Sequence, residues 1–190
     1  MEKILFDYIS RYMTLTEEVK QLIRELGIFK TCKKDTILLK EGERSDESFF
    51  VVQGCIRCYY IIDGEEKTTA FYTETESLAP LCTINKQRSE YYVTCVEDCI
   101  LLISTPEKER EAFEKFPFFE SLCRIMSEQR VAENQARFDN FKISSPEERY
   151  LHLLDTRPDL LQRVPQYQLA SFLGITPQSL SRLRKRIVTK

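Results

Sequence analysis

The chain has 190 residues, of which 42% are hydrophobic and 31% charged, with a net charge of −2. This is typical of a globular protein with one large domain or two modest ones. No apolar run approaches the roughly 18 residues that a membrane span needs, and the first residues lack the features of a signal peptide. We therefore expect a cytoplasmic protein with no membrane partner.

The small net charge hides a basic C-terminal segment. No acidic residue follows Asp159, so that segment carries +6, whereas the rest, with 22 Lys and Arg against 30 Asp and Glu, carries −8. The six basic residues are Arg163, Arg182, Arg184, Lys185, Arg186 and Lys190. A basic end on an acidic body suggests a polyanion partner, although a short basic terminus is often only a solvated tail.

The first predicted element is a helix that ends at Gly27. Thr14 is its expected N-cap, and Glu17 stands where a capping box places its carboxylate. An apolar stripe at helical spacing follows, formed by Val19, Leu22, Ile23 and Leu26.

From Ile28 to Ser104 the pattern changes to short β-rich runs separated by turn signals. The runs are Thr36–Leu39, Ser48–Val52, Cys55–Ile62, Lys67–Tyr72, Glu90–Val96 and Cys99–Ser104. Asp63-Gly64, between two runs, is the clearest hairpin signal. Many short strands with regular turns predict a small barrel or jelly roll.

Helix signals return at Thr105-Pro106, and no Pro or Gly interrupts the stretch from Phe118 to Phe141. This predicts a long helix with a seam at steps of three and four, formed by Phe118, Leu122, Ile125, Gln129, Ala132 and Ala136. Such a seam often faces a second chain. Packing against the chain's own barrel explains the pattern equally well.

A separate C-terminal domain is predicted to begin near residues 143–145. Ser145 is a good N-cap, Pro146 suits the first helical position, and Glu148 completes a capping box. The helix that follows is expected to end at Arg157-Pro158.

Residues 166–187 have the spacing of a helix-turn-helix motif. Ala170 is small enough for two helices to cross closely, and Gly174 suits the turn. Ile175 is expected to fill the angle between the helices, and Thr176-Pro177 to begin the second helix. A helical hairpin with a purely structural role is the alternative interpretation.

The second helix of this motif is expected to contact DNA. Leu180, Leu183 and Ile187 face inward, while Gln178, Ser179 and Arg182 present side chains that can recognise base edges. Phosphate contacts are assigned to the basic residues farther along the helix, namely Arg184, Lys185 and Arg186. Tyr167 and Thr176 complete the predicted DNA-binding residues.

With these elements in this order, the chain resembles the Crp/Fnr superfamily of transcription regulators. In the barrel the resemblance rests on the segments 34–43 (KDTILLKEGE) and 48–57 (SFFVVQGCIR). It implies an α+β fold in which a double-stranded β-helix (jelly-roll) sensor barrel at residues 1–116 precedes a dimerisation helix at 117–143 and a DNA-binding domain at 144–190. The implied assembly is a homodimer whose recognition helices enter successive major grooves of a pseudo-palindromic site.

The cyclic-nucleotide site of the family is altered in this sequence. Members that bind the nucleotide have a Gly-Glu-Leu-type cassette and an arginine that pairs with the phosphate, but no glycine lies between Gly64 and Gly174. Glu74 and Glu76 stand where a phosphate needs donors, and Arg88 is one position from the family arginine. We predict no cyclic AMP binding. The candidate effector pocket comprises Thr73, Glu74, Thr75, Glu76, Ser77, Arg88 and Ser89.

The winged form of the motif is also altered, because only Leu160 to Pro165 separates the two helical segments where a β-hairpin is usual. We predict a reduced or absent wing. Val164-Pro165 is in addition a poor N-cap for the first motif helix.

The seven cysteines are interpreted as buried structural thiols. Cys32 stands alone where an iron–sulfur cluster needs several ligands, and Cys55 and Cys58 point to opposite faces of one strand. Cys95 and Cys99 are expected to approach each other across a turn. Because His152 lacks a ligand partner and no catalytic motif is present, we expect no metal, no cofactor and no enzymatic activity.

The sequence therefore favours a sequence-specific, homodimeric transcription regulator that binds double-stranded DNA. RNA polymerase and an unidentified small-molecule effector are further candidate partners. The alternative is a small-molecule-binding or protein-interaction module whose basic C-terminus does not recognise DNA sequence. A gel shift with steep salt dependence would separate the two.

Overall fold

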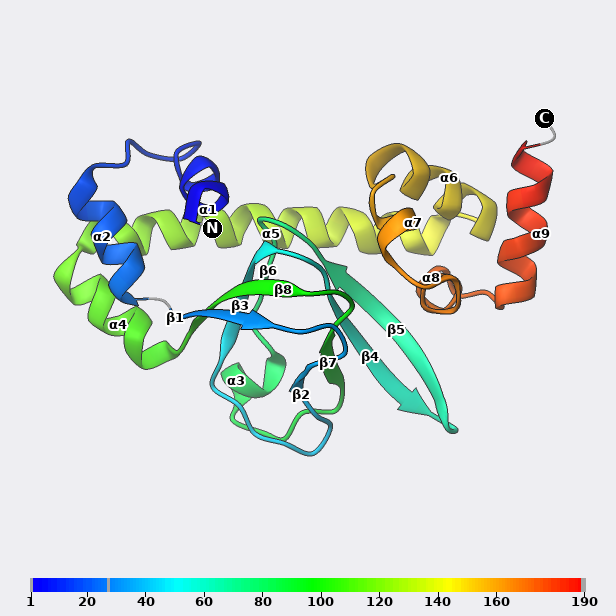
Figure 1. Cartoon of the computed structure of the whole chain (residues 1–190), viewed down its shortest axis with the longest axis horizontal. Coiled ribbons are helices and arrows are strands. Elements are labelled where there is room, and N and C mark those ends of the chain that lie inside the picture. The colour runs from blue at the N-terminus through cyan, green and yellow to red at the C-terminus, as the bar shows by residue number, and fades with distance from the viewer. Residues whose placement is uncertain (1, 27, 189–190) are drawn as a thin grey trace. The chain divides into compact units, whose positions relative to one another are not determined.

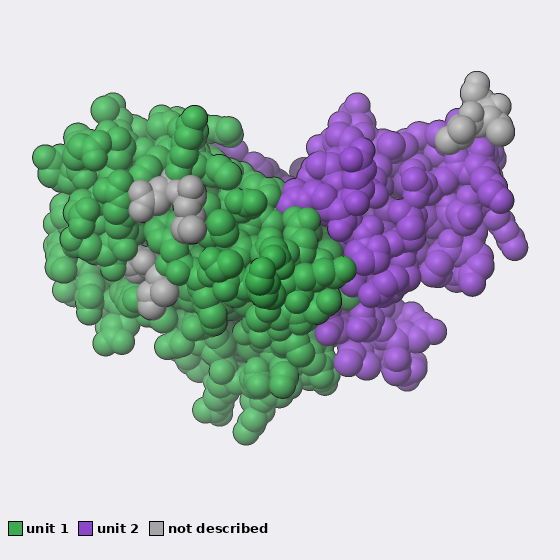
Figure 2. Space-filling view, viewed as in Figure 1, with its two compact units in different colours: residues 1–58, 71–127 green, residues 59–70, 128–190 purple. Residues whose placement is uncertain are grey.

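The computed structural model describes residues 2–26 and 28–188 (Figure 1). The chain divides into two compact units (Figure 2). Unit 1 comprises residues 1–58 and 71–127, and unit 2 comprises residues 59–70 and 128–190. None of the helices in the described ranges has the length and hydropathy that crossing a bilayer requires.

Two helices open unit 1, α1 (Glu2–Ile9) and α2 (Glu17–Leu26). The predicted cap of α2 at Thr14 is wrong, because the Thr16 hydroxyl accepts the Val19 N–H at 3.4 Å. Glu17 is already helical and pairs with Lys20 instead. The predicted stop at Gly27 lies outside the described residues.

Strands from both halves of residues 28–104 form two four-stranded sheets, with the orders β1-β8-β3-β6 and β2-β7-β4-β5. The strands are β1 (Ile28–Cys32), β2 (Ile37–Leu39), β3 (Ser48–Gln53), β4 (Ile56–Ile62), β5 (Glu65–Tyr72), β6 (Ser77–Leu78), β7 (Tyr92–Cys95) and β8 (Cys99–Ser104). β1 and β6 were not expected from the sequence. Neighbours distant in sequence pair antiparallel, as β1 does with β8, which confirms the predicted jelly roll.

The hairpin β4–β5 turns at Asp63-Gly64, where both residues have positive φ angles, 53° and 78°. This backbone combination matches the right-handed twist of the two strands. The hairpin predicted at this dipeptide is therefore confirmed.

Three further helices follow the strands or lie between them, α3 (Leu81–Asn85), α4 (Pro106–Lys115) and α5 (Pro117–Ile143). Thr105 caps α4 by accepting the Lys108 N–H at 3.4 Å, as the Thr105-Pro106 signal predicts. The predicted long helix is α5. The helix α3 was not expected.

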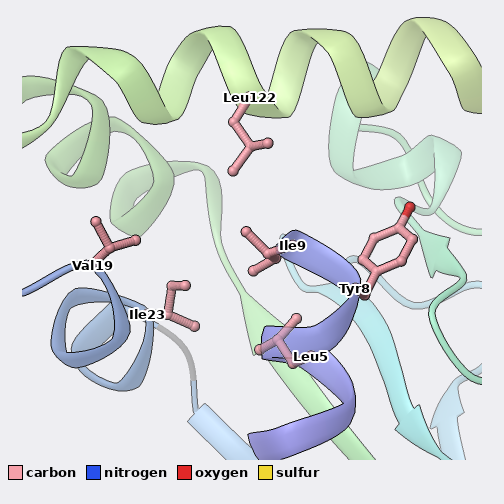
Figure 3. Close-up of a cluster of buried hydrophobic side chains, with 6 residues drawn as sticks. All are labelled: Leu5, Tyr8, Ile9, Val19, Ile23 and Leu122. Carbon is pink, nitrogen blue, oxygen red and sulfur yellow. The ribbon is translucent and has the colours of Figure 1, made fainter. Parts of the chain in front are cut away.

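A cluster of buried apolar side chains joins α1, α2 and α5 in unit 1 (Figure 3). Its members are Leu5, Tyr8, Ile9, Val19, Ile23 and Leu122. Leu122 is 5% exposed in this cluster, so its assignment to a partner-facing seam is wrong. The reason is that the N-terminal helices cover this position, which helical spacing alone does not reveal.

The C-terminal helices of unit 2 are α6 (Pro146–Thr156), α7 (Leu160–Arg163), α8 (Gln166–Leu173) and α9 (Pro177–Val188). The predicted capping box of α6 is present. Ser145 accepts the Glu148 N–H, and the Glu148 carboxylate accepts the Ser145 N–H at 2.7 Å. Hydrogen bonds from the Ser145 backbone N–H and hydroxyl to the carboxylate lower the pKa of Glu148. The short helix α7 occupies part of the segment between α6 and α8.

Candidate nucleic-acid interface

The turn between α8 and α9 has the geometry that the sequence predicts. Gly174 has a φ of 73°, a left-handed conformation that costs glycine little. The Ile175 N–H donates to the Ala170 carbonyl at 3.0 Å, and Gly174 donates to Ala170 and Ser171. This pattern closes α8 and fixes the direction in which the chain leaves it.

The two helices of the motif pack through small and apolar side chains. Ala170 and Leu169 are fully buried, and Leu173, Leu180 and Leu183 are at most 7% exposed. Tyr150 and Leu153 of α6 are buried in the same unit. A buried alanine at the helix crossing permits the close approach that a helix-turn-helix needs.

The N-terminus of α9 is capped by Thr176, whose hydroxyl accepts the Ser179 N–H at 3.2 Å. The same hydroxyl donates to the Ser179 Oγ at 3.0 Å. The two side chains are therefore linked, and Thr176 orients the Ser179 hydroxyl at the start of the helix. Pro165 makes no comparable side-chain bond at the start of α8, as predicted.

Gln178, Ser179 and Arg182, which we call the polar face, are all exposed. An amide, a hydroxyl and a guanidinium on the first turns of such a helix can pair with adenine, with several bases and with guanine, respectively. The structure thus brings the three predicted base-recognition residues to one exposed surface.

A hollow of about 440 Å³ lies between the start of α6 and α9. Ser179, Arg182 and Arg186 are among the residues that line it. Arg186 therefore shares a helical stripe with two residues of the polar face, and it forms an ion pair with Glu147 of α6. Its predicted contact with phosphate must compete with this carboxylate.

The remaining predicted DNA-binding side chains are exposed in unit 2. Arg184 and Lys185 are exposed on α9. Tyr167 is 55% exposed on α8, and its hydroxyl accepts a hydrogen bond from the Gln168 amide at 3.1 Å. All three can reach solvent, as contacts with a DNA backbone require.

Arg149 connects the end of α5 to the motif, a role that the sequence analysis missed. Its guanidinium lies 3.9 Å from the Phe141 ring centroid and donates to the Ser144 and Leu173 carbonyls at 3.1 and 2.9 Å. Arginine can stack on a ring and donate several hydrogen bonds at once. The only sequence signal for this role was an arginine three residues after the start of a helix, and many helices have an arginine there without such a role.

In residues 73–77, the first half of the candidate effector pocket, the glutamate side chains form hydrogen bonds within the barrel. Glu76 is 7% exposed, and its carboxylate accepts the Thr73 N–H at 2.8 Å and the Thr73 hydroxyl at 3.2 Å. Glu74 accepts the Gly54 N–H at 2.8 Å. Thr75 adopts a left-handed conformation, and Ser77 of β6 pairs with Phe50 of β3.

The second half of the pocket, Arg88 and Ser89, donates side-chain hydrogen bonds to backbone carbonyls. Arg88 donates to the Gly42 carbonyl at 2.7 Å, and the Ser89 hydroxyl donates to the Tyr91 carbonyl at 2.7 Å. The hydrogen bonds therefore hold Arg88 to the Gly42 turn, whereas the two glutamates bond to Thr73 and Gly54.

The cysteine thiols are mostly buried. Cys95 and Cys99 share a hydrogen bond, which confirms their predicted approach. This bond raises the pKa of Cys95, together with burial, and lowers that of Cys99. Burial raises the pKa of Cys58 to about 12 and that of Cys123 to about 11. Among the described residues, no three His, Cys, Asp or Glu side chains are grouped to hold a metal ion.

The described residues thus combine a jelly-roll barrel, a long helix and two C-terminal helices joined by a tight turn. Residues 29–116 match the family of the cyclic nucleotide-binding domain. No curated protein sequence matches the chain significantly.

Solved structures share the fold over most of the chain. A mutant of CooA from Carboxydothermus hydrogenoformans is 17% identical, with a TM-score of 0.70 over 92% of this chain and 81% of CooA. CLP of Xanthomonas campestris, described as a c-di-GMP-responsive global regulator, is 15% identical, with a TM-score of 0.69 over 92% of both chains. FixK2 from Bradyrhizobium japonicum is 18% identical, with a TM-score of 0.67 over 86% of this chain and 85% of FixK2. Residues 29–116 are therefore similar to a cyclic nucleotide-binding domain, and the chain shares the fold of CooA, CLP and FixK2.

Proposed function

We propose that the chain is a sequence-specific DNA-binding transcription regulator that acts as a homodimer. The observation that carries this proposal is the polar face, which is exposed on the second helix of a tightly packed helix-turn-helix. A purely structural helical hairpin would also be polar on its outer surface, but it would not need an amide, a hydroxyl and a guanidinium together on the first turns of its second helix.

In the proposed complex, α9 enters the major groove with its N-terminal turns against the bases. Gln178 and Arg182 make bidentate contacts with base edges, and Ser179 adds a hydroxyl contact. Arg184, Lys185 and the N-terminal end of α8 at Tyr167 contact phosphates, which supply affinity and register but no sequence information. Arg186 also contacts phosphate once its ion pair with Glu147 is broken.

The proposed dimer contact is formed by α5. Phe118 and Ile125 are 39% and 46% exposed, and Gln129, Ala132 and Ala136 are exposed as well. From Ile125 onward the spacing alternates between four and three residues, as at the core positions of a heptad repeat. The same stripe on two chains would form a coiled-coil contact. A two-fold dimer presents two copies of α9 and so recognises a pseudo-palindromic site.

The barrel is proposed to regulate this activity through a ligand other than cyclic AMP. The two glutamates that replace the glycine cassette already accept hydrogen bonds from Gly54 and Thr73. They occupy donors and add negative charge where an anion would have to bind. Any effector changes DNA binding only by its differential affinity for two conformations.

The test is a fluorescence-anisotropy titration of the full chain with a selected duplex and a shuffled duplex at several salt concentrations. We expect tighter binding of the selected duplex and a steep fall in affinity with salt, with a slope of about −0.9 per phosphate contact. Equal, weak and salt-insensitive binding of both duplexes would support the alternative, in which the basic C-terminus does not recognise DNA.

A further inference from the structure

The outer strand of one sheet makes an unusual contact within unit 2. β5 is the last strand in the order β2-β7-β4-β5 among the described strands. The backbone groups on its outer side therefore have no neighbouring strand, a situation that proteins usually cover or block. Residues 59–70 of the hairpin β4–β5 and the motif helices belong to the same compact unit.

The side chain of Ser171 in α8 takes the place of the missing neighbour. Its hydroxyl donates to the Glu66 carbonyl at 2.9 Å and accepts the Thr68 N–H at 2.9 Å. The carbonyl of residue i and the N–H of residue i+2 point to the same side of a strand. One hydroxyl therefore satisfies both, and we call these two hydrogen bonds the Ser171 bridge.

Ser171 also lies next to the turn between the two motif helices, so the bridge affects the direction of α9. The Ser171 carbonyl accepts the Gly174 N–H at 3.0 Å, so this residue also belongs to the turn that directs α9. Thr68 is only 6% exposed, whereas the polar face on α9 stays exposed. The bridge thus holds the motif without covering its proposed DNA surface.

We infer that Ser171 is a positioning residue, which fastens the first motif helix to the outer strand of the hairpin β4–β5 and so fixes the orientation of α9 in the dimer. This inference rests on the proposed function. The hairpin continues directly into the sheet of the barrel, so a shift of the β5 backbone moves α8 through the bridge. Two recognition helices can bind one palindromic site together only if each is held in a defined orientation.

The experiment compares Ser171→Ala with Ser171→Thr, which retains a hydroxyl. Alanine is the best helix former, so Ser171→Ala does not weaken α8 itself. Hydrogen exchange followed by NMR should show a protected Thr68 amide in the wild type and in Ser171→Thr, and an unprotected one in Ser171→Ala. Residual dipolar couplings of β5 and α8 should fit one common alignment in the wild type and two different ones in Ser171→Ala.

Binding to DNA provides the second measurement. Ser171→Ala should bind the full palindromic site about tenfold more weakly, equivalent to ~1.4 kcal/mol, with an unchanged affinity for an isolated half-site. Ser171→Thr should restore the full-site affinity. A uniform loss on both sites, or no loss on the full site, would contradict the positioning role.

The two proposals fail in different ways. If the wild-type chain shows no sequence preference on any duplex, the proposed function fails, while the exchange and dipolar-coupling data still decide whether the bridge holds α8. If the wild type binds as proposed but the Thr68 amide and the common alignment survive in Ser171→Ala, the bridge alone is refuted.

Discussion

At the scale of single residues, Arg182 and Lys185 of α9 separate the two kinds of DNA contact that the proposal assigns. Both are exposed, but only Arg182 belongs to the polar face. Arg182→Ala should cost about 1–3 kcal/mol at the cognate site and relax the base preference at one position. Lys185→Ala should weaken binding to all sequences alike and lower the salt slope by about 1.

Anisotropy titrations with the cognate site and with single-base variants distinguish these outcomes. The assignment of the polar face is wrong if Arg182→Ala binds cognate and random DNA with the wild-type affinities. Lys185→Ala serves as the matched control, since it removes one positive charge from the same helix.

The ion pair of Arg186 with Glu147 gives a second prediction at this scale. In Glu147→Gln the guanidinium no longer faces a carboxylate, and the surface carries one negative charge fewer. We expect higher affinity for cognate and random DNA alike, with a salt slope steeper by about 1 because Arg186 gains a phosphate contact.

Asp155→Asn is the control for this experiment, because it makes the same change of charge at an exposed position of the same helix. An increase of the same size in both variants would assign the effect to net charge alone. In that case Arg186 has no separate role in the interface.

At the scale of helices and strands, the features that depend on a few consecutive residues could be predicted. The caps at Thr105 and Ser145, the Asp63-Gly64 turn and the Gly174 turn each follow from local backbone chemistry, and the structure contains all four. The β-strand β1 was missed, because its identity depends on pairing with β8 about 70 residues away.

The errors at this scale share the same cause. Leu122 fits the heptad seam of α5 by spacing, yet α1 and α2 bury it. Ser171 resembles an ordinary polar helix residue until Glu66 and Thr68 are beside it. Contacts between segments far apart in the sequence decide such positions, and a single sequence does not specify them.

The proposed dimer contact of α5 leads to a prediction for this helix as a whole. Ala132→Glu places a charge in the proposed seam, where it would face its own copy across the two-fold axis, so the dimer should dissociate. Ala132 is exposed within the chain, so the monomer should keep its fold. Analytical ultracentrifugation measures the change in mass, and circular dichroism checks the helix content.

Asn134→Glu introduces the same charge on the other side of α5, at a position that is also exposed. It should remain dimeric. If both variants are dimers, the seam from Ile125 to Ala136 is not the contact between subunits.

At the scale of the whole molecule, the barrel has the fold of a cyclic nucleotide-binding domain, but Glu74, Glu76 and Arg88 of the candidate effector pocket already form hydrogen bonds within the chain. We expect isothermal titration calorimetry of the full chain with cyclic AMP to show no heat of binding at micromolar concentrations. The double variant Glu74→Gly, Glu76→Gly removes the two acids and serves as a comparison. Micromolar binding by the wild type would overturn this part of the account.

In the proposed dimer, two copies of α9 recognise one DNA site. Selection of bound duplexes from a random pool, followed by sequencing, tests it most directly. The account predicts an enriched inverted repeat with half-site centres about one helical turn apart, roughly 10–10.5 base pairs. A pool without enrichment, or one enriched only in single half-sites, would contradict it.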